Sequence, residues 1–223
     1  MLNIKPTDRV LEIGSGNRPR KRSDVLCDKF IEDNTERSGG DNVVIDARPF
    51  VVADVLALPF KDKSFDYVIT SHILEHVDDP YKFISELSRV AKAGYIETPS
   101  EISEKMFGWS FHKWIVRFEG DTIVMRARTG NSPFGDYFHG MYAHDLNFAE
   151  FVDSHFEDFY VQCEWENTIK LRVEQDASTD VNFNREMRAV STKTAVNSLG
   201  LYLFRPISTL FLQVLRHFRR FEQ

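Results

Sequence analysis

Short apolar runs alternate with polar segments through the first hundred residues, and this alternation constrains the fold more than any other feature. The runs occupy residues 10–13, 25–27, 50–53, 65–70 and 95–98, and their side chains are mostly β-branched or aromatic. Runs that are nearly continuous in apolar residues are expected of parallel strands that are covered on both faces. The pattern therefore predicts an α/β fold with an open, doubly wound and mostly parallel sheet.

One helix is well marked after the fourth run. Asp79 is a good N-cap residue, and Pro80 suits the first helical position. Phe83, Leu87 and Val90 follow at helical spacing and form one apolar stripe. A helix that begins at residue 80 and packs on the sheet is expected.

The strand pattern changes after residue 100. Residues 114–118 and 122–125 flank a glycine and predict a β-hairpin. Residues 160–165 and 169–173 alternate around Asn167, and we expect them to form an antiparallel pair that closes the sheet.

Between these two strand pairs the sequence indicates a loop and a helix. Residues 130–140 are rich in Gly, Asn, Ser and Pro, which is typical of a loop. Residues 143–155 carry apolar side chains at helical spacing and predict a helix.

Composition and charge exclude several classes of protein. The chain has 223 residues, of which 42% are hydrophobic and 28% charged, and this excludes a disordered or collagen-like chain. The net charge of −6 argues against broad nucleic-acid binding, which needs a basic face. Cys27 and Cys163 have no C-x-x-C spacing and are expected as buried free thiols. The first residues lack the apolar core of a secretion signal, so a cytoplasmic protein is expected.

The C-terminal part differs from the body. Residues 1–175 are expected to form the main domain, and residues 176–223 a polar linker followed by a basic, amphipathic helical tail. From residue 185 on there are seven Lys and Arg residues and two Glu residues. A basic helix with a broad apolar face, as in residues 199–221, either packs on its own sheet or in a dimer, or docks on a membrane surface or a partner.

Glycines and acidic residues follow the predicted strands in order. Gly14 and Gly16 follow the first strand, where glycines let backbone N–H groups approach a ligand closely. Asp28 and Asp54 follow the second and third strands, and a carboxylate there can accept hydrogen bonds from ribose hydroxyls or an adenine amino group. Ligands of open α/β sheets bind at the carboxyl ends of strands, so these residues predict a nucleotide-type cofactor site.

The ordered motifs resemble those of the class I S-adenosylmethionine-dependent methyltransferases. They read VLEIGSG at residues 10–16, ADVLALPF at 53–60, SFDYVI at 64–69 and SHILEHV at 71–77. The resemblance implies S-adenosylmethionine as the cofactor, a small molecule or a glycan or lipid precursor as the acceptor, and a Rossmann-like sheet of seven strands with an antiparallel C-terminal pair.

The resemblance also implies which residues contact the cofactor. They follow four strands: Glu12, Gly14 and Gly16 hold the methionine end; Asp28 binds the ribose; Asp54 and Val55 bind the adenine; Ser71 and His72 line the methyl side.

The segment after the glycines departs from the family pattern. Only residues 17–23 separate Gly16 from the second strand, whereas family members have a helix there, so a short turn is expected over residues 17–20. Arg18 is then a candidate for the methionine carboxylate. Asp46 is an alternative to Asp28 as the ribose ligand.

Methyl transfer from a sulfonium is a displacement that needs a base only when the acceptor is protonated at neutral pH. His72 is the favoured catalytic candidate, and His76, Glu97 and His112 are the others, with His76 more readily explained as a packed histidine. His139, His144 and Asp145 lack a recognisable ligand spacing, and no metal site is expected.

A substrate-side insertion is expected at about residues 101–145. Its aromatic run at residues 107–114 forms either part of the core, which is favoured, or a lid over the acceptor.

Two alternatives to a methyltransferase remain open. The first is a protein that binds S-adenosylmethionine without turnover. The second, an NAD(P)-dependent oxidoreductase of similar fold, is less favoured because the third glycine of G-x-G-x-x-G is absent and the motif at Asp54 is present.

Overall fold

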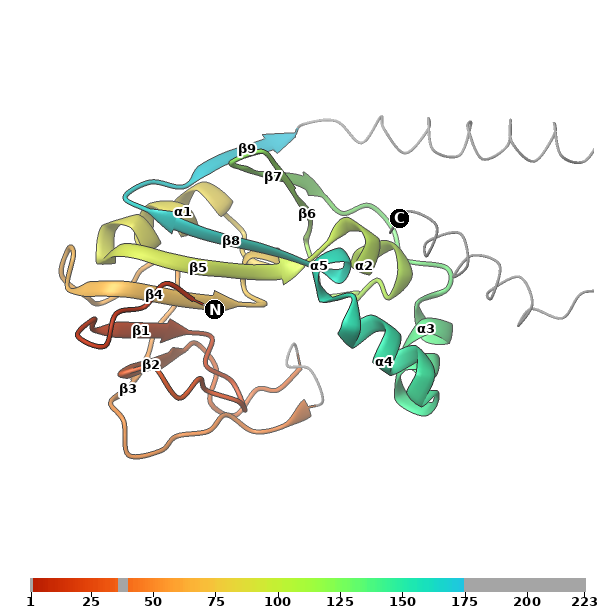
Figure 1. Cartoon of the computed structure of the whole chain (residues 1–223), viewed down its shortest axis with the longest axis horizontal. Helices are drawn as coiled ribbons and strands as arrows, with labels where there is room; N and C mark the ends of the chain where they lie inside the picture. Colours follow the sequence, from red (N-terminus) through yellow and green to blue (C-terminus); the bar gives the residue numbers. More distant parts are fainter. Residues whose placement is uncertain (1, 36–39, 175–223) are drawn as a thin grey trace, which may run out of the picture. The chain divides into compact units, whose positions relative to one another are not determined.

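A computed structural model describes residues 2–35 and 40–174, which lie in a unit spanning residues 1–175. Its main sheet has the strand order β3-β2-β1-β4-β5-β8 (Figure 1). The six strands are β1 (Val10–Ile13), β2 (Val25–Asp28), β3 (Phe50–Val52), β4 (Phe65–Ser71), β5 (Ala91–Pro99) and β8 (Tyr160–Glu166). Neighbouring strands are parallel except for β8, which runs antiparallel to β5. The predicted α/β class with a Rossmann-like, mostly parallel sheet is confirmed.

The strand order reverses beside β1. Strands β2 and β3 lie on one side of β1, and β4 and β5 lie on its other side. In open α/β sheets the crevice at such a reversal is where ligands bind. The residues that follow β1 and β4 therefore border the expected site.

A second sheet holds β6 (Trp114–Glu119), β7 (Thr122–Ala127) and β9 (Lys170–Glu174) in the order β6-β7-β9. Strands β6 and β7 form the predicted hairpin. The predicted pairing of residues 160–165 with 169–173 was wrong, because β9 pairs in parallel with β7. The main sheet consequently has six strands instead of seven.

Local geometry and packing explain this exchange of partners. Asn167 adopts a left-handed conformation with φ of 64°, and the chain changes direction there. Leu171 and Val173 then pack against the hydrophobic cluster that includes Ile123 and Met125 of β7. Apolar alternation in a strand specifies a buried face but not the neighbouring strand, so the sequence could not distinguish the two pairings.

Helix α1 (Pro80–Val90) covers one face of the sheet. Its N-cap residue Asp79 accepts a hydrogen bond from the backbone N–H of Lys82 at 2.9 Å. Phe83, Leu87 and Val90 are fully buried, as the apolar stripe predicts. On the other face, a separate cluster that includes Tyr67 and Tyr95 packs against Leu2 and Ile4 of the N-terminal segment.

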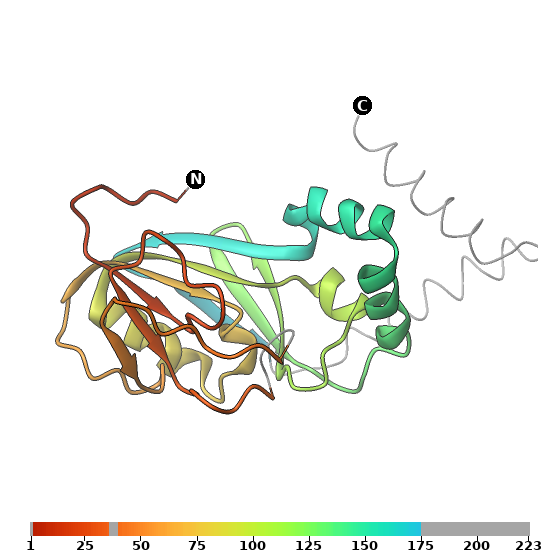
Figure 2. The same cartoon turned by 90° about the horizontal axis from the view of Figure 1, so that it is seen from below.

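Four helices gather beyond the carboxyl end of β5 (Figures 1 and 2). They are α2 (Glu101–Met106), α3 (Gly135–His144), α4 (Leu146–Ser154) and α5 (Phe156–Phe159), whereas the short 3-10 helix η2 (Leu74–His76) follows β4. The loop predicted at residues 130–140 was wrong from Gly135 onward, where α3 begins. The ring of Phe107 contacts those of Phe138, His139 and Tyr142 on α3, and such tertiary packing overrides the low helix propensity of this segment.

None of the helices in residues 2–35 and 40–174 combines the length and apolar character needed to cross a bilayer. The predicted linker and basic tail at residues 176–223 lie outside the described residues.

Candidate functional site

The turn after β1 is built on two glycines with positive φ. Gly14 has φ of 70° and Gly16 has φ of 52°, a region that favours glycine. The backbone N–H groups of Gly14 and Ser15 both donate to the carbonyl oxygen of Cys27, at 2.8 and 3.2 Å. A Cβ atom at Gly14 would lie 2.2 Å from Cδ1 of Ile73. The turn therefore requires glycine both for its conformation and for the space beside it.

Asp28 lies against this turn. Its Oδ2 accepts from the backbone N–H of Gly16 at 3.0 Å, and its Oδ1 accepts from that of Phe30 at 3.1 Å. The alternative ribose ligand, Asp46, is paired with Arg48 at 2.6 Å. Hydrogen bonds from the Arg48 side chain and backbone lower the pKa of Asp46 to about 2. Asp28 thus directly contacts the glycine turn, whereas Asp46 is occupied by an arginine.

Glu12 holds the short connection between β1 and β2. Its Oε2 accepts from the backbone N–H of Arg20 at 2.9 Å and from the hydroxyl of Ser23 at 2.5 Å. Burial raises the pKa of Glu12, and these hydrogen bonds only partly oppose that rise. Residues 17–23 form turns without a helix, so the predicted short turn is confirmed.

Asp54 follows β3 and lies next to Asp28. Its Oδ2 pairs with Nζ of Lys29, the residue after Asp28, at 2.8 Å, and its Oδ1 accepts from the backbone N–H of Leu56 at 2.8 Å. Burial opposes ionisation of Asp54, but these hydrogen bonds outweigh it and lower its pKa. Val55 is buried beside it. Two carboxylates therefore lie at consecutive strand ends, and one of them, Asp28, contacts the glycine turn.

His72 follows β4 and lies between two buried carboxylates. Its Nδ1 is 3.4 Å from Oε1 of Glu75, and its Nε2 is 3.7 Å from Oε1 of Glu97. Burial disfavours the imidazolium, but the interaction with Glu75 and the charges of both carboxylates outweigh burial and raise the pKa of His72. A raised pKa leaves a smaller fraction of His72 able to accept a proton at neutral pH. The side chain remains 45% exposed, which leaves it accessible to a ligand.

Arg20 connects the end of β4 with an open cleft. Its Nη2 donates to the hydroxyl of Ser71 at 3.1 Å and lies 3.8 Å from Oε2 of Glu97. Its guanidinium lies 5.5 Å from the centre of the Tyr95 ring. The cleft has a volume of about 720 Å³ and is lined by Leu2, Arg20, Tyr95, Glu97, Phe156, Gln162 and Glu164. Its lining is mostly polar.

Strand pairing organises the polar groups of this cleft. Glu97 of β5 lies opposite Gln162 of β8, and the Gln162 amide donates to the hydroxyl of Tyr95 at 2.7 Å. The Tyr95 hydroxyl in turn donates to Glu97. Sequence analysis missed Arg20, Tyr95 and Gln162. Two-residue spacing places Tyr95 and Glu97 on one face of a strand, but the sequence does not show that Gln162 lies opposite them.

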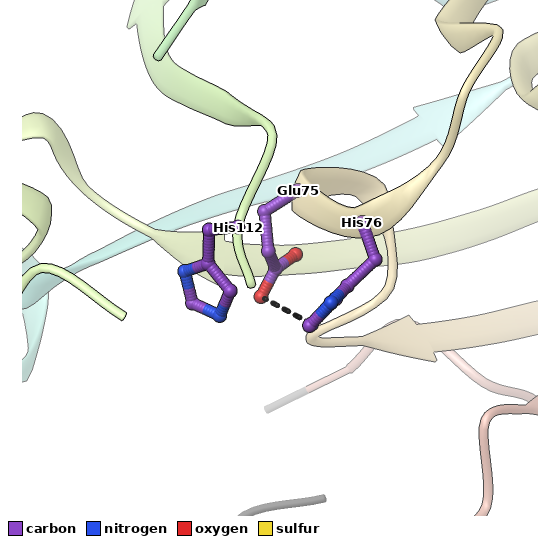
Figure 3. Close-up of side chains that lie close together, drawn as sticks. All are labelled: Glu75, His76 and His112. Carbon is purple, nitrogen blue, oxygen red and sulfur yellow. Dashed lines mark ion pairs between the residues drawn. The ribbon is translucent and has the colours of Figure 1, made fainter. Parts of the chain in front are cut away.

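The base candidates His76 and His112 also come together. Their ring centroids are 4.7 Å apart, and the His76 ring stacks on Phe111 at 5.6 Å. The buried carboxylate of Glu75 lies close to both rings (Figure 3). His112 bonds through Nδ1 to the buried Glu104, a partner that the sequence did not reveal.

The aromatic run at residues 107–114 contributes to the packed core, as favoured. Phe107 is buried, and its ring contacts those of Trp109, Phe148 and Phe159. The run therefore holds α3 and α4 against the end of the sheet.

Part of the chain is similar to known methyltransferases. Residues 26–96 match the family described as "Methyltransferase domain". The chain is 42% identical over 108 residues to the demethylmenaquinone methyltransferase of Renibacterium salmoninarum, covering 46% of this chain and 45% of that protein. It is 32% identical over 105 residues to the 27-O-demethylrifamycin SV methyltransferase of Amycolatopsis mediterranei. That alignment covers 42% of this chain and 38% of that protein. The chain thus spans about half or less of the length of these curated relatives.

Among solved structures, an S-adenosylmethionine-dependent methyltransferase from Thermotoga maritima aligns with a TM-score of 0.34 at 22% identity. That alignment covers 47% of this chain and 50% of that chain.

The strand order and the glycine turn define a Rossmann-like domain. Over residues 26–96 and their surroundings, the chain is similar to methyltransferases.

Proposed function

We propose that this protein transfers a methyl group from S-adenosylmethionine to a small molecule or to a glycan or lipid precursor. The observation that carries the proposal is the arrangement around the β1 turn. Gly14 and Gly16 adopt positive φ at the strand-order reversal, and Asp28 accepts a hydrogen bond from this turn. Asp54 follows the next strand and pairs with Lys29, the residue after Asp28. This arrangement suits an adenosyl group.

The chain's own residues fit that cofactor. Among the described residues, a Cβ atom at Gly16 would meet only the carbonyl oxygen of Gly14, at 3.8 Å, which leaves space for a ligand to approach. A carboxylate offers about four acceptor positions, so Asp28 can keep its backbone hydrogen bonds and still accept from ribose hydroxyls. Asp54 with Val55 would bind the adenine once Lys29 moves aside. Arg18 remains the candidate for the methionine carboxylate, because a guanidinium is a permanent cation with several donors. Glu12, which also holds the β1–β2 connection, stays our candidate for the methionine end.

The cleft beside Arg20 is our proposed acceptor site. Arg20 bonds to Ser71, on the methyl side of the proposed cofactor site, and also lines the cleft. Glu97, Gln162 and Glu164 supply acceptors and donors for a hydroxyl-rich or amine-bearing molecule. The named relatives act on menaquinone-type and rifamycin-type small molecules, which is consistent with an acceptor of this size class.

In this scheme the cofactor supplies an activated methyl group, and the protein aligns an acceptor atom with it and excludes water. We propose that His72 acts at the methyl side. As a base for an acceptor hydroxyl, it must be unprotonated at Nδ1 or Nε2. The rate would then rise with pH through a pKa that lies above the ordinary 6.5. The pH profile of His72→Gln would lose this rise if the proposal is correct, whereas an unchanged profile would assign the proton to another group.

Cofactor binding is the first test. S-adenosylhomocysteine should raise the melting temperature, since a ligand at about 100 times its Kd adds about 2.7 kcal/mol to the free energy of unfolding. NAD should not raise it. Asp54→Ala should weaken S-adenosylhomocysteine binding, whereas the control Asp62→Ala, an exposed member of an ion pair with Arg89, should not. Full affinity in Asp54→Ala would refute the proposed adenine contact, and stabilisation by NAD alone would favour an oxidoreductase.

Turnover is the second test. Wild-type protein incubated with labelled S-adenosylmethionine and panels of small molecules, glycans and lipid precursors should transfer label to one class. Arg20→Gln should reduce this transfer while leaving S-adenosylhomocysteine affinity within a small factor. Binding without transfer to any panel would favour the non-catalytic alternative. Cytoplasmic location, and contact of the tail with a membrane or a second copy, stay predictions.

A further inference from the structure

The cluster of Glu75, His76 and His112 has a composition that the proposed methyl transfer does not require. Glu75 and His76 belong to η2, and His112 precedes β6. The candidate ligand atoms of the three side chains all lie within 4.8 Å of one another. Figure 3 shows the two imidazoles on either side of the Glu75 carboxylate. One carboxylate and two imidazoles are a common donor set for zinc-type cations.

The Glu75 carboxylate is oriented for such a role. It is fully buried, and its Oε2 accepts from the hydroxyl of Thr98 at 2.8 Å. Its Oε1 has no hydrogen bond within the described part of the chain and lies 3.9 Å from Nε2 of His76 and 3.4 Å from Nδ1 of His72. A buried charged oxygen that lacks a hydrogen bond is costly unless a cation compensates it. Oε1 of Glu75, which faces the histidines, is therefore the oxygen available to bind an ion.

His112 is oriented in the same way. Its Nδ1 bonds to the carboxylate of Glu104, and both side chains are almost fully buried. Arg128 lies behind them, with its Nε 3.8 Å from Oε2 of Glu104. A proton held on Nδ1 by Glu104 leaves the lone pair of Nε2 for a metal ion. Carboxylates that orient metal-binding histidines in this way are typical of zinc sites.

We propose that Glu75, His76 and His112 bind one divalent cation of the zinc type, with Glu104 positioning His112. Bonds of about 2.0–2.2 Å bring ligand atoms closer together than in this cluster, so binding draws the side chains inward. The His76 side chain is 16% exposed, so it can move toward the other two ligands and an ion can reach the cluster from solvent beside it. Three protein ligands leave a coordination position for water or another oxygen. Such a site departs from the expectation of no metal, because His112 is distant in sequence from Glu75 and His76.

The test uses the untagged, chelator-treated full chain titrated with zinc sulfate by calorimetry and with cobalt(II) by visible absorption. Wild type should bind one ion per chain, and cobalt should show the absorption bands of a site with fewer than six ligands. His76→Asn should weaken binding by more than about tenfold, since loss of a supporting carboxylate alone costs about 10–100-fold. Glu104→Gln should weaken metal binding by about 10–100-fold. The control His144→Asn, at an exposed histidine outside the cluster, should bind as wild type does.

Two outcomes would overturn the proposal. One is the absence of stoichiometric binding to wild type, which would assign the cluster to charge pairing between Glu75 and its histidines. The other is undiminished binding by both His76→Asn and Glu104→Gln, with near-ultraviolet circular dichroism showing native packing. If His76→Asn does not fold, Glu75→Gln provides the same comparison with little change of shape. Binding is measured without S-adenosylmethionine, so a negative result leaves the proposed methyl transfer intact.

Discussion

At the scale of single residues, the turn after β1 depends on a glycine that no larger residue can replace without cost. Gly14 must take a positive φ, and the space a Cβ atom would need is already filled by Ile73. Gly120 in the β6–β7 turn has a similar φ of 63°, but no atom of residues 2–35 and 40–174 lies within 4 Å of its Cβ position. A substitution at Gly120 would therefore test backbone strain alone, whereas one at Gly14 would test backbone strain together with steric conflict.

The first prediction compares alanine at these two glycines. Gly120→Ala should lower the free energy of unfolding by about 1–3 kcal/mol, the usual cost of a strained backbone conformation. Gly14→Ala should cost about 1–3 kcal/mol more, because Ile73 must shift, and should also weaken S-adenosylhomocysteine binding. Urea denaturation and calorimetry measure both effects. Equal losses of stability in the two variants would show that Ile73 accommodates the extra methyl group.

The second prediction concerns the pH dependence contributed by His72. Its pKa in the folded protein is raised, mainly because Glu75 and Glu97 outweigh the effect of burial. The folded state thus binds the proton more tightly than the unfolded state, whose pKa is near 6.5. The stabilisation is fully present below pH 6.5 and is lost as pH rises through the folded value. The stability difference between wild type and His72→Gln should shrink over that range, as urea titrations at a series of pH values would measure. A difference that grows with pH would contradict the assigned interactions.

At the scale of secondary-structure elements, the parts with strong local signals could be predicted. The five parallel strands were visible as apolar runs, and α1 was visible from Asp79, Pro80 and its stripe. The elements that depend on distant packing could not be predicted. Strand β9 would alternate in the same way beside β8 or β7, and α3 contains glycine and follows a proline yet forms around Phe107.

The same distinction holds for the site. The glycines and acids that follow the strands were predicted because each is local to its strand end. The neighbours of His72 were not, because Glu75 and Glu97 approach it only when β4, η2 and β5 lie side by side. Arg20 reaches Ser71 only because the β1–β2 connection has no helix.

The third prediction tests the N-cap of α1 with two adjacent aspartates. Asp79 accepts from the backbone N–H of Lys82, so Asp79→Ala should lower the free energy of unfolding by about 1 kcal/mol. Asp78 pairs with Lys113 at 2.6 Å, but its side chain is 81% exposed. Asp78→Ala should therefore cost about 0–1 kcal/mol. Thermal and urea denaturation measure the difference, and a larger loss for Asp78→Ala would contradict this account of the helix start.

At the scale of the whole domain, two buried cysteines lie near opposite edges of the main sheet. Cys27 lies on β2, near one edge, and Cys163 lies on β8, at the other edge. Burial raises the pKa of Cys27 to about 12 and that of Cys163 to about 11. Because the thiolate is the reactive form, both residues are protected by the fold in two ways, through access and through ionisation.

The fourth prediction uses this protection to test whether the sheet unfolds as one unit. Iodoacetamide should label neither cysteine in the native protein at neutral pH, and both should become reactive over the same range of urea. The order β3-β2-β1-β4-β5-β8 makes each strand depend on its neighbours, so one transition is expected for both residues and for circular dichroism. Peptide mass spectrometry assigns the label to each site. Labelling of Cys163 well before Cys27 would mean that β8 detaches from β5 first, and the antiparallel edge would then be a separately unfolding element of the domain.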